Sequence, residues 1–196
     1  MAVSGINSVL SDAHITAILD QIGKKESTST PGGPVNVNIG RSKDPGVVKA
    51  GHQNYGVINS IGFVGKYQIG YVGLADAGYV RIGPKKNSDL LNAANWLGVN
   101  GCSSLDDFLT NPAAQEDAAR KLIQANYRYM RKYISDCNTA DVGGFCGAAH
   151  LVGWSDAIKL RQGIAKKDAN GMSAQTYFDV CRSACLGEIP TLPTAP

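Results

Sequence analysis

The chain has 196 residues, of which 43% are hydrophobic and 18% are charged, and its formal net charge is +3. This length and apolar content predict one folded domain with a sizeable core and exclude a largely disordered protein. The lysines and arginines are scattered rather than gathered in a stripe, and no apolar run is long enough to cross a membrane. We therefore expect no nucleic-acid partner and no membrane span.

The N-terminus and the cysteines bear on the compartment. Residues 1–10 lack the basic and apolar regions of a secretion signal, so Sec export is not expected. The five cysteines are an odd number and show no disulfide framework, which favours synthesis in a reducing cytoplasm.

The first predicted helix carries the most informative apolar pattern. Ser11 is a good N-cap, and the helix after it has a stripe of apolar residues on one face: Ile15, Ile18, Leu19 and Ile22. Continuing that stripe by four residues reaches Glu26, so an acid is expected on the apolar face at the end of the helix.

The middle of the chain alternates irregular and helical segments. Glycine and proline interrupt residues 27–55, which predicts a long irregular or small β insertion. A short strand or turn is expected over 57–63. Helices are expected over three further segments: 66–77 with Gly78 as its end, 88–97 with Gly98 as its end, and 105–109.

The C-terminal half is predicted to be helical. Asn111-Pro112 opens a helix with a broad buried face that includes Tyr129, Tyr133 and Ile134. Ser155 and Ser173 are expected to cap helices ending near 162 and 185. The prediction is a mainly α single domain over 1–189, followed by a Pro-rich tail at 190–196.

Four segments occur in an order that resembles a known superfamily. They are Glu26-Ser27, the Gly-Lys-Tyr-Gln of 65–68, the Asn-Pro-Ala-Ala-Gln of 111–115, and the Ala-Ala-His-Leu-Val-Gly of 148–153. Together they resemble lytic transglycosylases and goose-type lysozymes over roughly residues 11–153. Residues 55–70 and the Ala-Ala-His-Leu segment are more similar still to peptidoglycan-cleaving modules of phage tails and contractile injection systems.

The resemblance implies a lysozyme-like α+β fold and a cleavage activity. The expected substrate is bacterial peptidoglycan, cut at the β-1,4 bond between MurNAc and GlcNAc, without a cofactor. The expected location is a virion, where phage tail or baseplate proteins are partners. From such a machine, or after synthesis in the bacterial cytoplasm, the protein would act on the wall in the periplasm.

Glu26 is the candidate catalytic acid. Glycosidic cleavage needs a carboxylic acid that stays protonated near neutral pH, and an apolar surrounding raises a carboxyl pKa. The resemblance implies that the same Glu then acts as base toward the sugar's 6-hydroxyl and closes a 1,6-anhydro ring. A hydrolase would instead need a second acid to hold water, for which Asp44 is the alternative; a turn residue before Pro45 is the preferred interpretation.

The remaining site candidates are expected around the sugar. Ser27 and Gln68 offer hydrogen bonds, Gly65 allows close approach of the backbone, and Tyr67 is either a stacking surface or a core aromatic. His150 stands where the family has Tyr and is predicted to orient the acid or to be a buried structural residue. Leu151 replaces the family's Asn, which leaves the anhydro and hydrolysed products as alternatives.

Two further alternatives remain open. Cys146 with His150 and Cys181 with Cys185 have the spacing of ligand pairs on helices, so a zinc site competes with ordinary buried cysteines, which we favour. The second alternative is a tail or baseplate subunit that keeps the lysozyme fold without activity.

Overall fold

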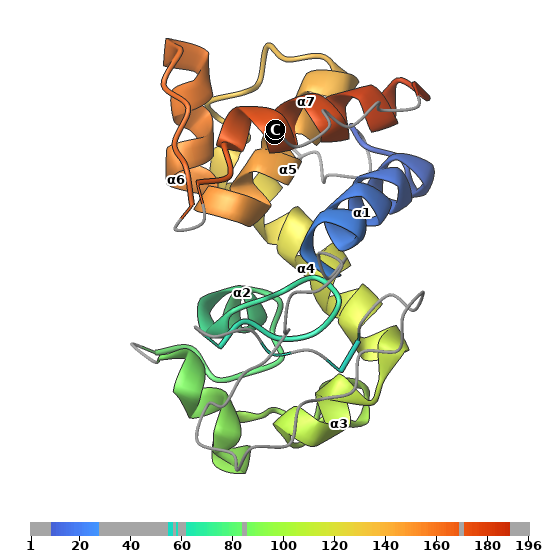
Figure 1. Cartoon of the computed structure of the whole chain (residues 1–196), viewed down its shortest axis with the longest axis vertical. Coiled ribbons are helices and arrows are strands. Elements are labelled where there is room, and N and C mark those ends of the chain that lie inside the picture. Colours follow the sequence, from blue (N-terminus) through green and yellow to red (C-terminus); the bar gives the residue numbers. More distant parts are fainter. Residues whose placement is uncertain are drawn as a thin grey trace, which may run out of the picture. The chain divides into compact units, whose positions relative to one another are not determined.

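The computed structural model describes residues 9–27, 55–56, 58, 62–83, 86–168 and 171–188. Within these ranges the protein is mainly helical, as expected, and extended backbone pairs only in isolated bridges (Figure 1). No described helix is long and apolar enough to cross a membrane. The predicted insertion over 27–55, including Asp44, and the tail at 190–196 lie outside the described residues, except for the helical Ser27 and Tyr55.

Eleven helical segments follow one another along the described chain. They are α1 (Asp12–Ser27), α2 (Tyr71–Asp76), the 3-10 helices η2 (Asn87–Leu91), η3 (Ala93–Asn95) and η4 (Val99–Gly101), α3 (Leu105–Leu109), α4 (Pro112–Met130), α5 (Thr139–Val152), α6 (Trp154–Ala157), the 3-10 helix η5 (Ile158–Gln162), and α7 (Ala174–Cys185).

The chain divides into two compact units. Unit 1 comprises Met1–Ile22 and Ile123–Pro196, and unit 2 comprises Gly23–Leu122. The boundaries therefore fall inside helices α1 and α4. This division leaves the prediction of a single domain over 1–189 untested, because two lobes of one domain also separate in this way.

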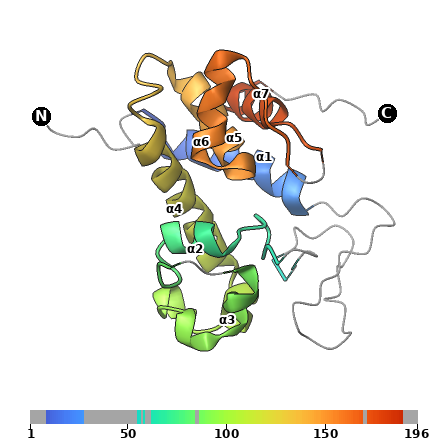
Figure 2. The ribbon, with the colours of Figure 1, turned by 90° about the vertical axis from the view of Figure 1, so that its left-hand side faces the viewer.

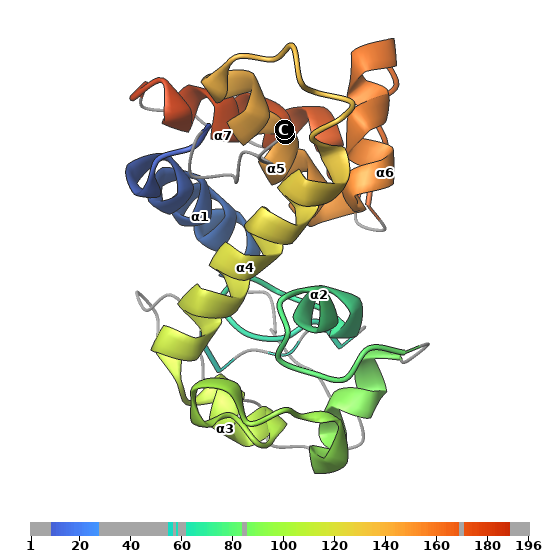
Figure 3. The same ribbon diagram turned by 180° about the vertical axis from the view of Figure 1, so that it is seen from behind.

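Unit 2 is built on the first half of α4. Helix α2 packs on it where Gly73 meets Leu122, and α3 joins it through a hydrogen bond from Gln115 to the Phe108 carbonyl. Figure 3 shows α2 and α3 beside this part of α4. Trp96 and Tyr79 pack around the Phe108 ring. The result is a small apolar core under a set of short helices and turns.

Unit 1 has its core where α5 meets α7. Both helices lie side by side in Figures 1 and 2, with α6 next to α5. Three glycines of α5 face α7 directly, because a Cβ on Gly144 or Gly147 would lie 2.7 Å from the Phe178 ring or 2.4 Å from the Cys181 sulfur. The third, Gly143, faces Cys185 in the same way. Small residues therefore set the close packing of this pair.

Several predicted helix ends are confirmed. Ser11 Oγ accepts a hydrogen bond from the His14 backbone N–H, and the stripe from Ile15 to Ile22 is buried. Asn111 and Ser173 cap α4 and α7 through their side-chain oxygens. The short helix over 105–109 and the helix end at Gly78 are present as predicted.

Other predicted helices are wrong in part. Residues 66–70 form a turn rather than helix, because Gly65 and Gln68 both have positive φ. The segment 88–97 is two 3-10 helices, followed by an extended Trp96 that pairs with Val80. Helix α4 ends at Met130, and Tyr129 and Tyr133 are exposed rather than buried. Gly153, not Ser155, precedes α6.

Candidate functional site

A tight turn over residues 64–69 forms the base of the candidate site in unit 2. Val64 and Ile69 pair through two backbone hydrogen bonds of 3.1 and 3.0 Å. Inside the turn, the Gln68 backbone N–H donates to the Gly65 carbonyl over 3.1 Å, and the Gln68 side-chain amide donates to the same oxygen over 2.7 Å. Because these bonds close the turn, Lys66 and Tyr67 are held at its tip.

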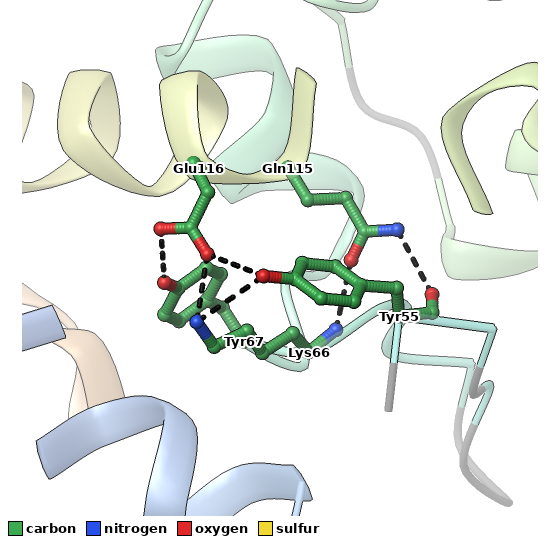
Figure 4. Close-up of polar contacts among 5 residues, drawn as sticks. All are labelled: Tyr55, Lys66, Tyr67, Gln115 and Glu116. Carbon is green, nitrogen blue, oxygen red and sulfur yellow. Dashed lines mark hydrogen bonds and ion pairs between the residues drawn. The ribbon is translucent and has the colours of Figure 1, made fainter. Parts of the chain in front are cut away.

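Gln115, in the first turns of α4, anchors this turn. Its Oε1 accepts from the Lys66 backbone N–H over 2.8 Å, and its Nε2 donates to the carbonyls of Tyr55 and Phe108, each over 2.8 Å. The Gln115 side chain is buried and uses both ends of its amide (Figure 4). Three chain segments thus converge on one side chain.

Glu116, the next residue, holds the side chains of the turn. Its Oε1 accepts from Lys66 Nζ over 2.7 Å and from the Tyr55 hydroxyl over 2.8 Å, while its Oε2 accepts from the Tyr67 hydroxyl. The Lys66 ammonium also lies 5.3 and 4.8 Å from the ring centroids of Tyr55 and Tyr67. Figure 4 shows Glu116 pointing from α4 into this group, which we call the Glu116 cluster (Tyr55, Lys66, Tyr67 and Glu116).

The Glu116 cluster is an ionised pair with two phenols around it. Burial raises the pKa of Glu116, but hydrogen bonds from Lys66, Tyr67 and Tyr55 outweigh burial and hold that pKa below its usual range. Burial lowers the pKa of Lys66, but its bond to Glu116 more than compensates and leaves the pKa raised. Burial and the Glu116 carboxylate raise the pKa of Tyr55. At neutral pH the charges of Lys66 and Glu116 therefore compensate each other.

The end of α1 lies against this cluster. A Cβ on Gly23 would stand 2.8 Å from Lys66 Cε and 3.4 Å from Tyr67 Cε1, so the helix backbone contacts both side chains. Glu26 follows Gly23 by three residues and Ile22 by four, and such spacings place side chains on one face of a helix. Glu26 is half-buried on that face. The last turn of α1, with Glu26, thus lies next to the 64–69 turn.

The structure shows the surroundings of three predicted site residues of the turn. Tyr67 is 1% exposed, so the core aromatic is the correct alternative and its ring offers no stacking surface. Gly65 allows close approach of Gln115 rather than of a sugar, since a Cβ there would be 2.1 Å from Gln115 Oε1. Gln68 is buried, and its amide nitrogen donates to the Gly65 carbonyl of the turn itself. Substrate binding by Gln68 stays a prediction.

The roles predicted for His150 and Ser27 stay predictions. His150 is half-buried near the end of α5, in unit 1, whereas Glu26 belongs to unit 2. Ser27 is the last residue of α1. The predicted orientation of the acid by His150 thus concerns residues of different units.

The sequence interpretation missed the partners that hold the turn. Lys66 and Gln115 stood inside the quoted segments without a role, and Glu116 follows directly after one of them. Two signals were available: a lysine within the Gly-Lys-Tyr-Gln segment of 65–68, and adjacent Gln and Glu at the start of a helix rich in alanine. Neither signal predicts a contact by itself, because only the folded chain brings the two segments together.

The cysteines show no ligand arrangement in the described part of the chain. Among those residues, no group of three or more His, Cys, Asp or Glu side chains is placed to hold a metal ion. All five cysteines are thiols. Burial raises the pKa of Cys146 to about 12 and that of Cys185 to about 11. These are protonated thiols between α5 and α7, which is the opposite of what a nucleophile requires.

Comparisons with known proteins found no relative of this chain. No model of a protein family matches the chain, and neither a curated protein nor a solved structure does.

Proposed function

We propose that this protein is a lysozyme-like α+β enzyme that cleaves the MurNAc–GlcNAc bond of peptidoglycan as a lytic transglycosylase, with Glu26 as its acid and base. The resemblance of residues 55–70 and 148–153 to tail-associated modules supports a place in a phage tail or a related injection machine. Its partners there are the cell wall and the neighbouring tail or baseplate proteins.

One observation carries the proposal. Two of the four segments that resemble the superfamily meet within unit 2, because Gln115 binds the Lys66 backbone although more than 40 residues separate the segments. The helical turn that leads into the Glu26-Ser27 segment packs on the same turn, through Gly23 against Lys66 and Tyr67. Segments that share a motif order by chance have no reason to share contacts. Their convergence supports a common site with Glu26 at its edge.

The Glu116 cluster provides a fitting electrostatic environment for an acid. A general acid must keep its proton near neutral pH, and an unpaired cation nearby would lower its pKa. The Lys66 ammonium, whose side chain packs on Gly23 of α1, is not unpaired, because Glu116 bonds it over 2.7 Å and compensates its charge. Glu26 then donates its proton to the leaving oxygen. As a carboxylate it accepts the proton of the sugar's 6-hydroxyl, whose oxygen closes the 1,6-anhydro ring.

The test is Glu26→Gln, with Glu188→Gln as its matched control. Glu188 is an exposed glutamate after α7, in the other unit. Removal of a general acid should lower the release of muropeptides from purified walls by about a hundredfold or more, while Glu188→Gln should release them at the wild-type rate. Mass spectrometry of the products should find 1,6-anhydro-MurNAc ends.

Three results would decide against parts of the proposal. Wild-type activity in Glu26→Gln removes this residue from the chemistry. Reducing MurNAc ends replace the transglycosylase by a lysozyme-type hydrolase. No release by the wild-type protein leaves an inert tail or baseplate subunit with the lysozyme fold.

A further inference from the structure

Three aromatic side chains gather on the surface of unit 1. Tyr129 lies at the end of α4, Tyr133 follows in the next turn, and Trp154 begins α6. The Trp154 ring centroid is 5.7 Å from that of Tyr129 and 6.4 Å from that of Tyr133, with interplanar angles of 31° and 20°. Tyr129 and Tyr133 are 42% and 41% exposed. We call these three residues the aromatic triad.

The triad is held in place by polar contacts behind it. The Arg161 guanidinium donates to the Tyr133 carbonyl over 2.7 Å and pairs with both carboxylate oxygens of Asp136. Arg161 belongs to η5, which continues directly from the helix that begins with Trp154. The segments that carry the three rings are thus fastened to each other, so little conformational entropy remains to be lost when a ligand covers them.

The surroundings of the triad are basic. Arg128 and Lys132, which directly precede Tyr129 and Tyr133 in the chain, are exposed, and Lys132 Nζ lies 4.7 Å from the Tyr133 ring centroid. The two nearby carboxylates, Asp136 and Asp156, are paired with Arg161 and Lys159. Within the described ranges, no ion pair joins Arg128 or Lys132 to a carboxylate. A ligand at the triad therefore meets positive charge that is not paired with any carboxylate of the described residues.

We infer that the aromatic triad, with Arg128 and Lys132, is a binding site for an anionic glycan strand. Flat aromatic rings bind the apolar C–H faces of pyranose rings, and rigid Tyr and Trp anchors beside cations dominate the energy of many binding sites. A peptidoglycan strand offers both features, because carboxylates of its peptide stems flank its sugar rings. The identity of the polymer rests on the proposed function, but the site itself belongs to unit 1, and none of its residues is in the catalytic proposal.

The experiment measures binding to purified sacculi with the Glu26→Gln chain, so that the wall stays intact. Replacing both Tyr129 and Tyr133 by alanine should weaken co-sedimentation by about tenfold or more, because each truncated ring removes stacking energy. Replacing both by phenylalanine keeps the rings and should retain binding within about threefold. Ile164→Ala, at another exposed apolar residue of unit 1, should bind like the parent.

Two further arms separate stacking from charge. Neutral GlcNAc oligomers should change the fluorescence of Trp154, read in a Trp96→Phe chain, and this signal should be lost in the double alanine variant. The Arg128→Gln/Lys132→Gln variant should still bind the neutral oligomers but should lose most of the salt-dependent part of sacculus binding.

The inference is overturned if the double alanine variant binds sacculi like its parent, or if the chain binds single-stranded oligonucleotides more tightly than sacculi. Neither result touches the proposed function, which is tested by muropeptide release. Conversely, a protein that releases no muropeptides but still binds sacculi through the aromatic triad would contradict the catalytic proposal. That result would leave this site as part of a glycan-binding protein.

Discussion

The 64–69 turn of unit 2 and the α5–α7 pair of unit 1 are both closely packed, but different forces hold them. In the turn, Gln115 and Glu116 satisfy backbone and side-chain groups with hydrogen bonds and one ion pair. Between α5 and α7, the contact is made by glycines on one helix and by Phe178, Cys181 and Cys185 on the other. Directional hydrogen bonds therefore hold the 64–69 turn, whereas the complementary shape of two helix surfaces holds the α5–α7 pair.

This difference predicts different responses to mutation. A hydrogen-bonded region fails when a partner is lost, because buried donors and acceptors stay unsatisfied. A close-packed region fails when an atom is added, because neighbouring backbone cannot give way. The two tryptophans report the regions separately, since Trp96 lies in unit 2 and Trp154 in unit 1. Replacing one tryptophan by phenylalanine leaves the fluorescence of the other as the only tryptophan signal.

The largest effect is expected for Gly65→Ala. Gly65 has φ of 75°, and an added Cβ would lie 2.1 Å from Gln115 Oε1. Strain in the backbone and displacement of the central amide should together lower the free energy of unfolding of unit 2 by about 4 kcal/mol. Urea titration of the Trp154→Phe chain measures it.

Gly78→Ala is the matched control for Gly65→Ala. Its φ is 78°, but no atom lies within 4 Å of the added Cβ. It should cost only about 1 kcal/mol, so the difference between the variants measures the contact with Gln115. Equal losses would show that Gln115 moves aside without cost.

The second effect tests shape in unit 1. A Cβ on Gly144 would stand 2.9 Å from the Phe178 carbonyl oxygen, which belongs to the backbone of α7. Gly144→Ala should destabilise unit 1 by about 3 kcal/mol despite the better helix propensity of alanine. Gly143→Ala should cost about 1 kcal/mol, because its close neighbours are the side chains of Cys185 and Ile18, which can rotate. If both variants lose the same amount, backbone contact is not the reason. The Trp96→Phe chain provides the signal.

The third effect tests the hydrogen bonds and the ion pair of Glu116 in unit 2. Glu116→Gln leaves the buried Lys66 ammonium without its carboxylate and should lower the free energy of unfolding by about 2 kcal/mol; the partial exposure of Glu116 keeps the loss below that of a fully buried pair. Asp106→Asn, on an exposed carboxylate of α3, is the control.

The stability difference between the wild-type chain and Glu116→Gln should depend on pH, because the pKa of Glu116 is lowered in the folded state. A carboxyl whose pKa is lower in the folded than in the unfolded state stabilises the fold fully above its unfolded pKa. This stabilisation is lost as the pH falls through the folded pKa. The wild-type chain should therefore lose part of its advantage over Glu116→Gln between neutral pH and the acid side of the usual carboxyl range. A constant difference over that interval contradicts the ionised pair.

Among the variants of the Glu116 cluster, Tyr67→Phe should have the smallest effect. The variant keeps the buried ring and removes only the hydroxyl that donates to Glu116, so unit 2 should lose about 1 kcal/mol. Tyr71→Phe removes a neutral hydrogen bond to the Arg81 carbonyl in the same unit and should cost less. A larger loss in Tyr71→Phe would show that the charge of Glu116 adds nothing to this bond.

Elements whose signals are local could be predicted from the amino-acid sequence alone. Ser11, Asn111 and Ser173 cap helices as predicted, because an N-cap bonds a backbone group only two or three residues away. The stripe from Ile15 to Ile22 is buried because helix geometry alone gathers those residues on one face. Glu26 was placed on the last turn of α1 for the same reason.

Parts that depend on distant segments could not be predicted, because their contacts form only in the folded chain. The turn at 64–69 replaced a predicted helix, because Gln115 takes the Lys66 N–H and leaves room only for a glycine at 65. Tyr67 is buried and its hydroxyl bonds Glu116, which lies far along the chain, whereas the buried Gln68 amide bonds the Gly65 carbonyl within the same turn. Conversely, Tyr129 and Tyr133 are exposed, although the helical period placed them on the buried face; α4 ends at Met130, so this period does not extend to Tyr133. A periodic pattern states which residues share a face, whereas the neighbours that pack against that face are chosen by residues far along the chain.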